Sequence, residues 1–383
     1  MGKLRKFVAP EFIFGEGARK LAGQYAGNLG ARKVLLVTDP GIIAAGWLDD
    51  IIASLAEAGL PYTVFSAVTP NPKAEEVMTG AEIYKSEGCN TIVALGGGSP
   101  IDCAKGIAIV STNHRHILSF EGVDKVEIPM PPLICIPTTA GTSADVSQFC
   151  IIMNKQDKAK ISIVSKAVLP DAALIDPIVT TTMDPYLTAC TGMDALTHGI
   201  EAFVSTGSFM VTDMHALEAI RIISKNLIEA VKKPDDIDLR SKIMHGSLEA
   251  GLAFSNAILG AVHAMAHSLG GLLDLPHGEC NSVLLDHAMA FNFNAAAEKY
   301  KIIGEAMGLD FRGMNTGETK KAILSYVNNL RRSVGIHKTL SKMGVKTCDI
   351  PDLAQKAMKD VCIYTNPREA TKRDIEVIYE EAL

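Results

Sequence analysis

The chain has 383 residues, of which 48% are apolar and 21% charged, a composition typical of globular proteins rather than disordered chains. Its length allows two ordinary domains. The net charge of −6, with no basic cluster, argues against a nucleic-acid partner. The N-terminus lacks the apolar segment of a signal peptide, and the eight cysteines form no C-x-x-C pair. We therefore expect free thiols in a reducing compartment, the cytoplasm.

Short apolar runs alternate with helical patterns in the first half of the chain, which predicts a parallel sheet covered by helices. The predicted strands are 33–39, 62–66, 91–95 and 133–136, and the predicted helices are 47–58 and 74–87. Residues 149–153 and 159–164 resemble a hairpin added to that sheet, which 173–177 closes.

Strand patterns stop after Thr180, and the rest of the chain is predicted to be helical. We therefore expect two domains: an α/β domain, residues 1–178, and an all-α domain, residues 179–383. Ligands of α/β sheets bind beyond the carboxyl ends of the strands, and domain clefts are favoured sites, so we expect the functional residues to converge there.

A glycine-rich loop follows the third predicted strand, where Gly96-Gly97-Gly98-Ser99 leads into a helix. Glycines let the backbone approach a ligand closely, and amide groups at a helix start suit a phosphate. We expect Ser99 to cap this helix and Asp102, one turn later, to reach a polar ligand group or to favour the helix dipole. The loop matches neither standard nucleotide-binding fingerprint, so a simple tight turn is the alternative.

A second polar loop follows the fourth predicted strand and contains Thr138, Thr139 and Thr142. Its hydroxyl groups could bind a pyrophosphate or a ribose. Asp39, at the end of the first strand, could accept hydrogen bonds from an adenosine ribose and repel a 2′-phosphate, which favours NAD over NADP. A turn-starting aspartate is the alternative for Asp39.

Three histidines fall within one short segment, His263, His267 and His277. The first two are four residues apart and share a helix face, and we expect Gly270-Gly271 and Pro276 to break that helix. The stretch from Ala250 to Leu273 has no charged residue, as in membrane helices, but its glycines, polar residues and histidines favour a buried helix.

Asp194 and His198 are also four residues apart on a predicted helix, so they can give two ligands to one cation. A hydrogen-bonded surface pair is the alternative, although apolar neighbours favour burial. With His263 and His277 they form a set of one carboxylate and three histidines. Such a set accepts Fe(II), Zn(II) or another first-row ion.

Five motifs together resemble those of the iron-dependent (group III) alcohol dehydrogenases: G-G-G-S-P-I-D-C-A-K, P-T-T-A-G-T, G-M-D-A-L-T-H-G-I-E, V-H-A-M-A-H-S-L-G-G and P-H-G-E-C-N. They stand in the family's order, and F-I-F-G-E-G and T-N-P-R extend the resemblance over nearly the whole chain. The resemblance implies a Rossmann-like dinucleotide-binding domain followed by a helical metal-binding domain, the dehydroquinate synthase-like fold. It also implies NAD(P) and a divalent metal between the domains.

The resemblance assigns the site residues one by one. It makes Asp194, His198, His263 and His277 the metal ligands and places His267 near the nicotinamide and the substrate, outside the metal shell. The residues that it implies for the cofactor are Asp39, Asn71, Gly97, Gly98, Ser99, Asp102, Thr138, Thr139, Thr142 and Lys160. One departure borders this set: Ser143-Ala144-Asp145 stands where the family usually has G-S-E.

The expected activity is reversible oxidation of a small primary alcohol to its aldehyde, with NAD and Fe²⁺ or another divalent ion, in a homodimer or larger homo-oligomer. A glycerol or polyol dehydrogenase, or a non-redox lyase like dehydroquinate synthase, would share the fold. A regulatory protein that binds metal and nucleotide without turnover is a third alternative. We expect no nucleic-acid or membrane partner.

Overall fold

The computed structural model describes residues 4–383; the first three residues, part of the N-terminal stretch in which no signal peptide is predicted, lie outside it. The chain forms two compact units. One is Val8–Thr182, and the other combines residues 4–7 with Met183–Leu383. Sequence patterns alone place the boundary near Ile178.

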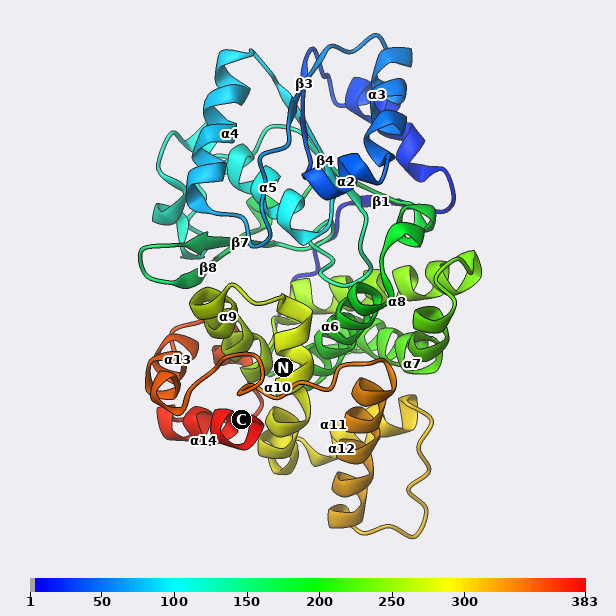
Figure 1. The fold of residues 1–383 in the computed structure, drawn as a ribbon, viewed down its shortest axis with the longest axis vertical. Helices are drawn as coiled ribbons and strands as arrows, with labels where there is room; N and C mark the ends of the chain where they lie inside the picture. Colours follow the sequence, from blue (N-terminus) through cyan, green and yellow to red (C-terminus); the bar gives the residue numbers. More distant parts are fainter. Residues whose placement is uncertain (1–3) are drawn as a thin grey trace. The chain divides into compact units, whose positions relative to one another are not determined.

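The first unit is built on a parallel sheet packed with helices (Figure 1). The sheet has six strands in the order β1-β9-β6-β4-β2-β3. Its strands are β1 Glu11–Phe14, β2 Val34–Val37, β3 Tyr62–Phe65, β4 Thr91–Gly96, β6 Leu133–Pro137 and β9 Ala172–Ile175. The helices of this unit are α1 Ala22–Asn28, α2 Pro40–Ala44, α3 Trp47–Glu57, α4 Ala74–Ser86 and α5 Gly98–Asn113. The four strands and two helices predicted for this half are confirmed, whereas the edge strand β1 was not predicted.

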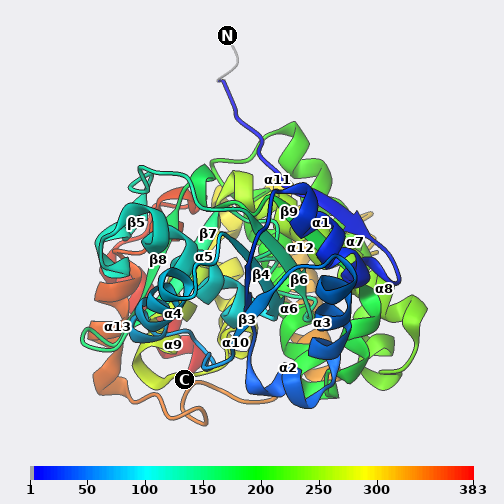
Figure 2. The same cartoon turned by 90° about the horizontal axis from the view of Figure 1, so that it is seen from above.

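The four central strands are buried on both faces, and successive side chains along each strand point to opposite faces. Leu36 of β2 joins a core with α1 and α3, whereas its neighbour Leu35 joins a core with α4 and α5. Figure 2 shows these two helix pairs on opposite sides of the sheet. All four residues of β2 are fully buried, which explains why the strand appears in the sequence as a continuous apolar run.

The predicted hairpin exists, but it does not join the main sheet. It consists of β7 Phe149–Asn154 and β8 Ala159–Val164, and it forms a separate three-stranded sheet with β5 Gly122–Val123. The prediction was wrong on this point because the free edge of β8 pairs with β5, which is only two residues long and gives no strand pattern.

The second unit is helical, as predicted for the chain after Thr180. Its helices are α6 Pro185–Val204, α7 Met210–Lys232, α8 Ile237–Ala257, α9 Ala261–Leu273, α10 His277–Asn292, α11 Ala297–Ala306, α12 Thr316–Ser333, α13 Ile350–Ala357 and α14 Lys372–Ala382. Short 3₁₀ helices add η1 Ala18–Leu21, η2 Ile117–Phe120, η3 Lys166–Val168, η4 Pro177–Thr182, η5 Phe293–Ala295, η6 Thr347–Asp349 and η7 Val361–Thr365 across the chain.

The apolar stretch from Ala250 to Leu273 is divided between α8 and α9. Among the described helices none is long and apolar enough by itself to cross a membrane, and these two pass that test only as a pair bent by 100°. At the corner, Ile258 has φ 62° and ψ −170°, a conformation that costs a β-branched residue about 1–3 kcal/mol. All eight cysteines are free, as predicted, and only Cys348 is exposed.

Candidate functional site

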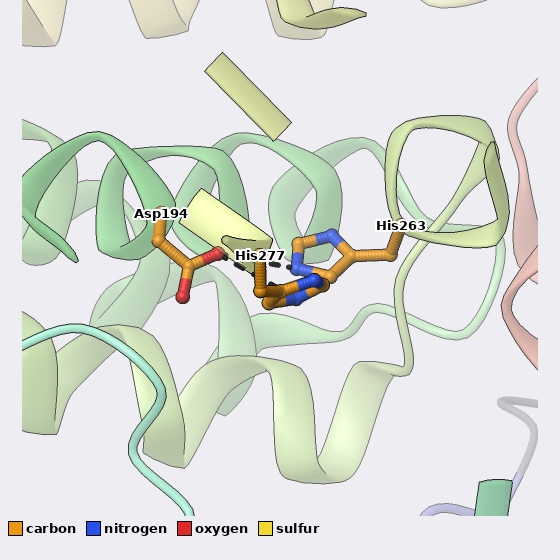
Figure 3. A group of neighbouring side chains, drawn as sticks. All are labelled: Asp194, His263 and His277. Atoms are coloured by element: carbon orange, nitrogen blue, oxygen red, sulfur yellow. Dashed lines mark ion pairs between the residues drawn. The ribbon is translucent and has the colours of Figure 1, made fainter. Parts of the chain in front are cut away.

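Three of the four predicted metal ligands converge on one point in the helical unit. The ligand atoms of Asp194, His263 and His277 all lie within 4.8 Å of one another. The Asp194 carboxylate oxygen Oδ1 is 3.7 Å from His263 Nε2 and 3.8 Å from His277 Nε2. Figure 3 shows the carboxylate and the two imidazole rings turned toward each other. Bonds of about 2.0–2.2 Å from one cation to such atoms would leave them about this far apart.

His198 lies beside this group but outside the three converging atoms. Its ring stacks on the His263 ring with 4.5 Å between centroids, and on Phe254 with 4.2 Å. Both Asp194 and His198 lie on α6, four residues apart and buried, so the surface-pair alternative is excluded. Burial alone would raise the pKa of Asp194, but His198, His277 and His263 hold it well below its ordinary value, which keeps the carboxylate ionised.

Gly278 allows α10 to bring His277 next to Asp194. A Cβ atom at this position would lie 2.8 Å from the carbonyl carbon of Cys190 and 3.4 Å from the Cβ of Asp194. Both neighbours belong to α6, so the two helices approach closely because residue 278 has no side chain. The ligands from α6 and α10 therefore depend on this glycine for their spacing.

Glu201 fixes the orientation of His263. Its Oε2 atom is 2.5 Å from His263 Nδ1, and its Oε1 atom accepts the backbone N–H of Val262 at 2.8 Å. Glu201 is buried, and it raises the pKa of the His263 ring together with Asp194, against the effect of burial. With its N–H on Nδ1 toward Glu201, the ring directs Nε2 at the ligand group, a common arrangement behind metal-bound histidines.

His267 has a different partner from His263, although both lie on one face of α9. Its Nδ1 atom is 2.8 Å from Oδ2 of Asp360, and its ring stacks on that of His277 at 5.2 Å. The other carboxylate oxygen of Asp360 accepts the backbone N–H of Cys362 at 2.8 Å. Burial alone would raise the pKa of Asp360, but the contact with His267 lowers it below its ordinary value. The imidazole of His267 is thus held in one orientation by a carboxylate.

The predicted break between His267 and His277 is wrong in part. Gly270 and Gly271 lie inside α9, where both are buried, because tertiary packing overrides the low helix propensity of glycine. The helix ends instead at Asp274, whose φ is 52°. Pro276 then precedes α10, which begins at His277.

The C-terminal segment holds α9 in place. Asn366 Oδ1 accepts the backbone N–H of Ala261 at 3.1 Å, at the first residue of α9. Further along the helix, the Tyr379 hydroxyl donates to the carbonyl oxygen of Met265 at 2.8 Å. With the Asp360 contact, three positions along the last 24 residues therefore fix the helix that carries His263 and His267.

In the α/β unit the two predicted polar loops abut. A Cβ on Gly97 would lie 3.0 Å from Thr139 Cγ2, and one on Gly98 would lie 2.9 Å from Thr142 Cγ2. The backbone N–H of Thr138 donates to the carbonyl of Gly96 at 3.0 Å. A side chain at either position would press on these threonines, and the contacts place the threonine loop directly against the start of α5.

The start of α5 suits a phosphate. Its N-cap is Gly97, which makes no side-chain cap, so the prediction that Ser99 caps the helix is wrong. Ser99 lies in the first turn, where its Oγ accepts the backbone N–H of Asn71 at 3.2 Å. Backbone N–H groups in the first turn of this 16-residue helix can therefore donate to a bound anion. A pyrophosphate fits this donor set.

The remaining predicted cofactor residues are Asp102, Lys160 and Asp39. Lys160, on β8, lies near enough to lower the pKa of Asp102, but burial is the larger effect and raises it to about 7. Asp39 caps α2 by accepting the N–H groups of Gly41 and Ile42 at 2.7 and 3.0 Å. The turn-starting role considered for Asp39 is therefore real, whereas its contact with a ribose stays a prediction.

Three residues that contact the predicted site residues were missed from the sequence. They are Glu201, Asp360 and Asn281, whose amide nitrogen donates to Asp194 Oδ1 at 2.6 Å. Glu201 and Asn281 stand in the motifs G-I-E and P-H-G-E-C-N, so their positions were marked although their roles were not. Asp360 belongs to no motif and is 93 residues from its partner His267. No local pattern could have joined them.

Comparison with known proteins covers both units. A family model described as "Iron-containing alcohol dehydrogenase" matches residues 9–177, and one described as "Fe-containing alcohol dehydrogenase family, C-terminal" matches residues 188–383. The 1,3-propanediol dehydrogenase of Citrobacter freundii is 41% identical over 372 residues, 97% of this chain and 96% of that protein. The NAD-dependent methanol dehydrogenase of Bacillus methanolicus is 37% identical over 377 residues, 98% of this chain and 99% of that one.

Solved structures agree with the sequence matches. The crystal structure of a 1,3-propanediol oxidoreductase has a TM-score of 0.96 at 39% identity and covers 100% of both chains. That of the NADH-dependent butanol dehydrogenase A from Thermotoga maritima has a TM-score of 0.91 at 26% identity, over 99% of this chain and 98% of that one.

Proposed function

Since the chain belongs to the iron-containing alcohol dehydrogenase family, we propose that it interconverts small primary alcohols or diols and their aldehydes, using NAD and a divalent metal. The observation that carries the proposal is the convergence of Asp194, His263 and His277. The names of the relatives, which include propanediol and methanol dehydrogenases, support short substrates. They give no support to the lyase and regulatory alternatives.

The metal would be held by Asp194, His198, His263 and His277. When bound, it would supply a Lewis acid for the substrate oxygen, and NAD would accept the hydride. Nitrogen and carboxylate ligands suit Fe²⁺ and Zn²⁺ alike, and the family name favours iron. Glu201 would keep the His263 lone pair directed at the cation.

His267 would move the proton. Its Nδ1 atom is engaged by Asp360, so Nε2 is the nitrogen left to exchange a proton with substrate or solvent. Because the ring is fixed by a buried carboxylate, the exchange needs little reorganisation.

NAD would lie with its pyrophosphate on Gly97, Gly98 and Ser99, at the start of α5. We assign Asn71, Asp102, Thr138, Thr139, Thr142 and Lys160 to the rest of the cofactor, on the support that they surround this loop. The carboxylate of Asp39 would favour NAD over NADP by repelling a 2′-phosphate. We also propose that the enzyme acts in the cytoplasm, which its free thiols support, as a homodimer or larger homo-oligomer.

Two variants test the proposal. We expect His263→Ala to lose both bound metal and turnover, and His267→Ala to keep the metal while turning over more slowly. Metal content is measured by elemental analysis, and turnover by NADH formation with ethanol, 1-propanol and 1,3-propanediol. Full metal content and activity in His263→Ala would contradict the assignment of the centre. Metal binding without NADH formation from any of these alcohols, in the unmodified protein, would contradict the activity.

A further inference from the structure

Asn281 lies at the centre of the three converging ligands. It is fully buried on α10, four residues after His277 and so on the same helix face. Its amide nitrogen Nδ2 is 2.6 Å from Asp194 Oδ1, 3.1 Å from His263 Nε2 and 3.2 Å from His277 Nε2. One amide nitrogen, which carries two N–H groups, therefore lies within hydrogen-bonding distance of all three atoms assigned to the metal, and it donates to Asp194.

The orientation of this amide is fixed by its surroundings. If the carboxamide were turned over, its oxygen would face the ionised oxygen of Asp194 at hydrogen-bonding distance, with repulsion in place of a hydrogen bond. The amide oxygen Oδ1 is buried and, within residues 4–383, has no hydrogen-bond partner. Asn281 thus gives its donor end to the ligands and leaves its acceptor end unsatisfied, which costs stability.

The amide and a cation cannot use the same histidine atoms together. An imidazole Nε2 atom that is not protonated has a single lone pair. When His263 and His277 are neutral, with the proton on Nδ1, that lone pair either accepts the Asn281 N–H or binds a metal. Asp194 is less restricted, because a carboxylate oxygen can accept more than one partner.

We propose that Asn281 competes with the metal: its amide binds the ligand atoms when the cation leaves, and the cation must displace it to enter. This inference rests on the metal centre proposed above. The ligands do not need Asn281 for their placement, since Glu201 orients His263 and Gly278 sets the distance between α6 and α10. Competition, rather than preorganisation, therefore decides its effect on affinity.

Two substitutions of Asn281 measure the competition. Asn281→Ala removes the donor, and we expect about tenfold tighter binding of Zn²⁺, equivalent to one net buried hydrogen bond. Asn281→Asp keeps the size of the side chain but replaces the N–H donor with a carboxylate, whose negative charge the cation neutralises. This variant should therefore bind Zn²⁺ more tightly than Asn281→Ala. Affinity is measured by competition with a chromophoric chelator. The Tm of the chelator-stripped protein should fall in both variants, and that of the Zn²⁺-loaded protein should fall less.

A control on the same helix is Ser282→Ala. The buried Ser282 hydroxyl donates to the Gly278 carbonyl at 2.6 Å, within α10, so its loss should lower the Tm of stripped and loaded protein equally and leave the affinity unchanged. Weaker or equal Zn²⁺ binding in both Asn281 variants would overturn the inference while the proposed function stands. If His263→Ala bound Zn²⁺ as tightly as the unmodified chain, the centre itself would be misplaced, and both proposals would fail.

Discussion

Gly278→Ala is expected to separate α6 and α10, two of the three helices that carry the candidate metal ligands. The added Cβ would overlap the Cys190 carbonyl, whose carbon would lie only 2.8 Å away. That neighbour is backbone inside α6 and cannot rotate aside, so α10 must shift. Overpacking of this kind costs about 1–3 kcal/mol. Metal–ligand distances tolerate only about ±0.2 Å, so a shift of His277 should lower metal affinity by about 10- to 100-fold.

The assay combines thermal unfolding of the stripped protein with Zn²⁺ competition against a chelator. Gly27→Ala is the matched control, because Gly27 lies in α1 with ordinary helical φ and nothing within 4 Å of an added Cβ. It should stabilise the chain by about 0.4–1 kcal/mol and leave metal affinity unchanged. A Gly278→Ala protein with the Tm and the Zn²⁺ affinity of the unmodified chain would refute the reasoning.

Three further substitutions address single contacts. Glu201→Gln should weaken Zn²⁺ binding by about 10- to 100-fold in chelator competition, since a neutral amide is a poorer partner for His263; unchanged affinity would remove Glu201 from the centre. Asp39→Ser retains a helix cap without the charge, so kcat/KM with NADP should rise relative to NAD; an unchanged ratio would leave Asp39 only its capping role. Burial raises the pKa of Asp102 to about 7 in the folded protein. The protonated carboxyl group therefore contributes stability that is fully present below about pH 4 and is lost as the pH rises through 7. Between pH 5 and 8 the Tm of Asp102→Asn should therefore increase relative to the Tm of the unmodified chain. A Tm difference that stays constant with pH would contradict the raised pKa.

Elements of the fold could be predicted because burial leaves a period in the sequence. The strand Val34–Val37 is buried on both faces and therefore appears as an unbroken apolar run. The two-residue strand Gly122–Val123 is too short to leave any period, so the hairpin that pairs with it was assigned to the wrong sheet. Tertiary packing also overrode a local rule at Gly270, where the glycine pair does not end the helix.

The candidate site could be predicted only as far as its motifs extend. Spacing placed Asp194 and His198 on one face of a helix, and the family resemblance separated the roles of His263 and His267. The partner of each histidine was not visible, because Glu201 and Asp360 meet them only in the folded chain. Sequence spacing constrains neighbours on one helix, whereas contacts between distant helices depend on packing that no local pattern encodes.

The attachment of α9 to Asp360, Asn366 and Tyr379 has a consequence for the synthesis of the protein. A ribosome makes the chain from the N-terminus, so the histidines of α9 emerge about a hundred residues before the segment that anchors them. The candidate metal ligand His263 can then reach the geometry described above only after Tyr379 has emerged. Removal of the segment that contains Asp360, Asn366 and Tyr379 should therefore lower metal affinity through the placement of α9, although it removes no candidate ligand.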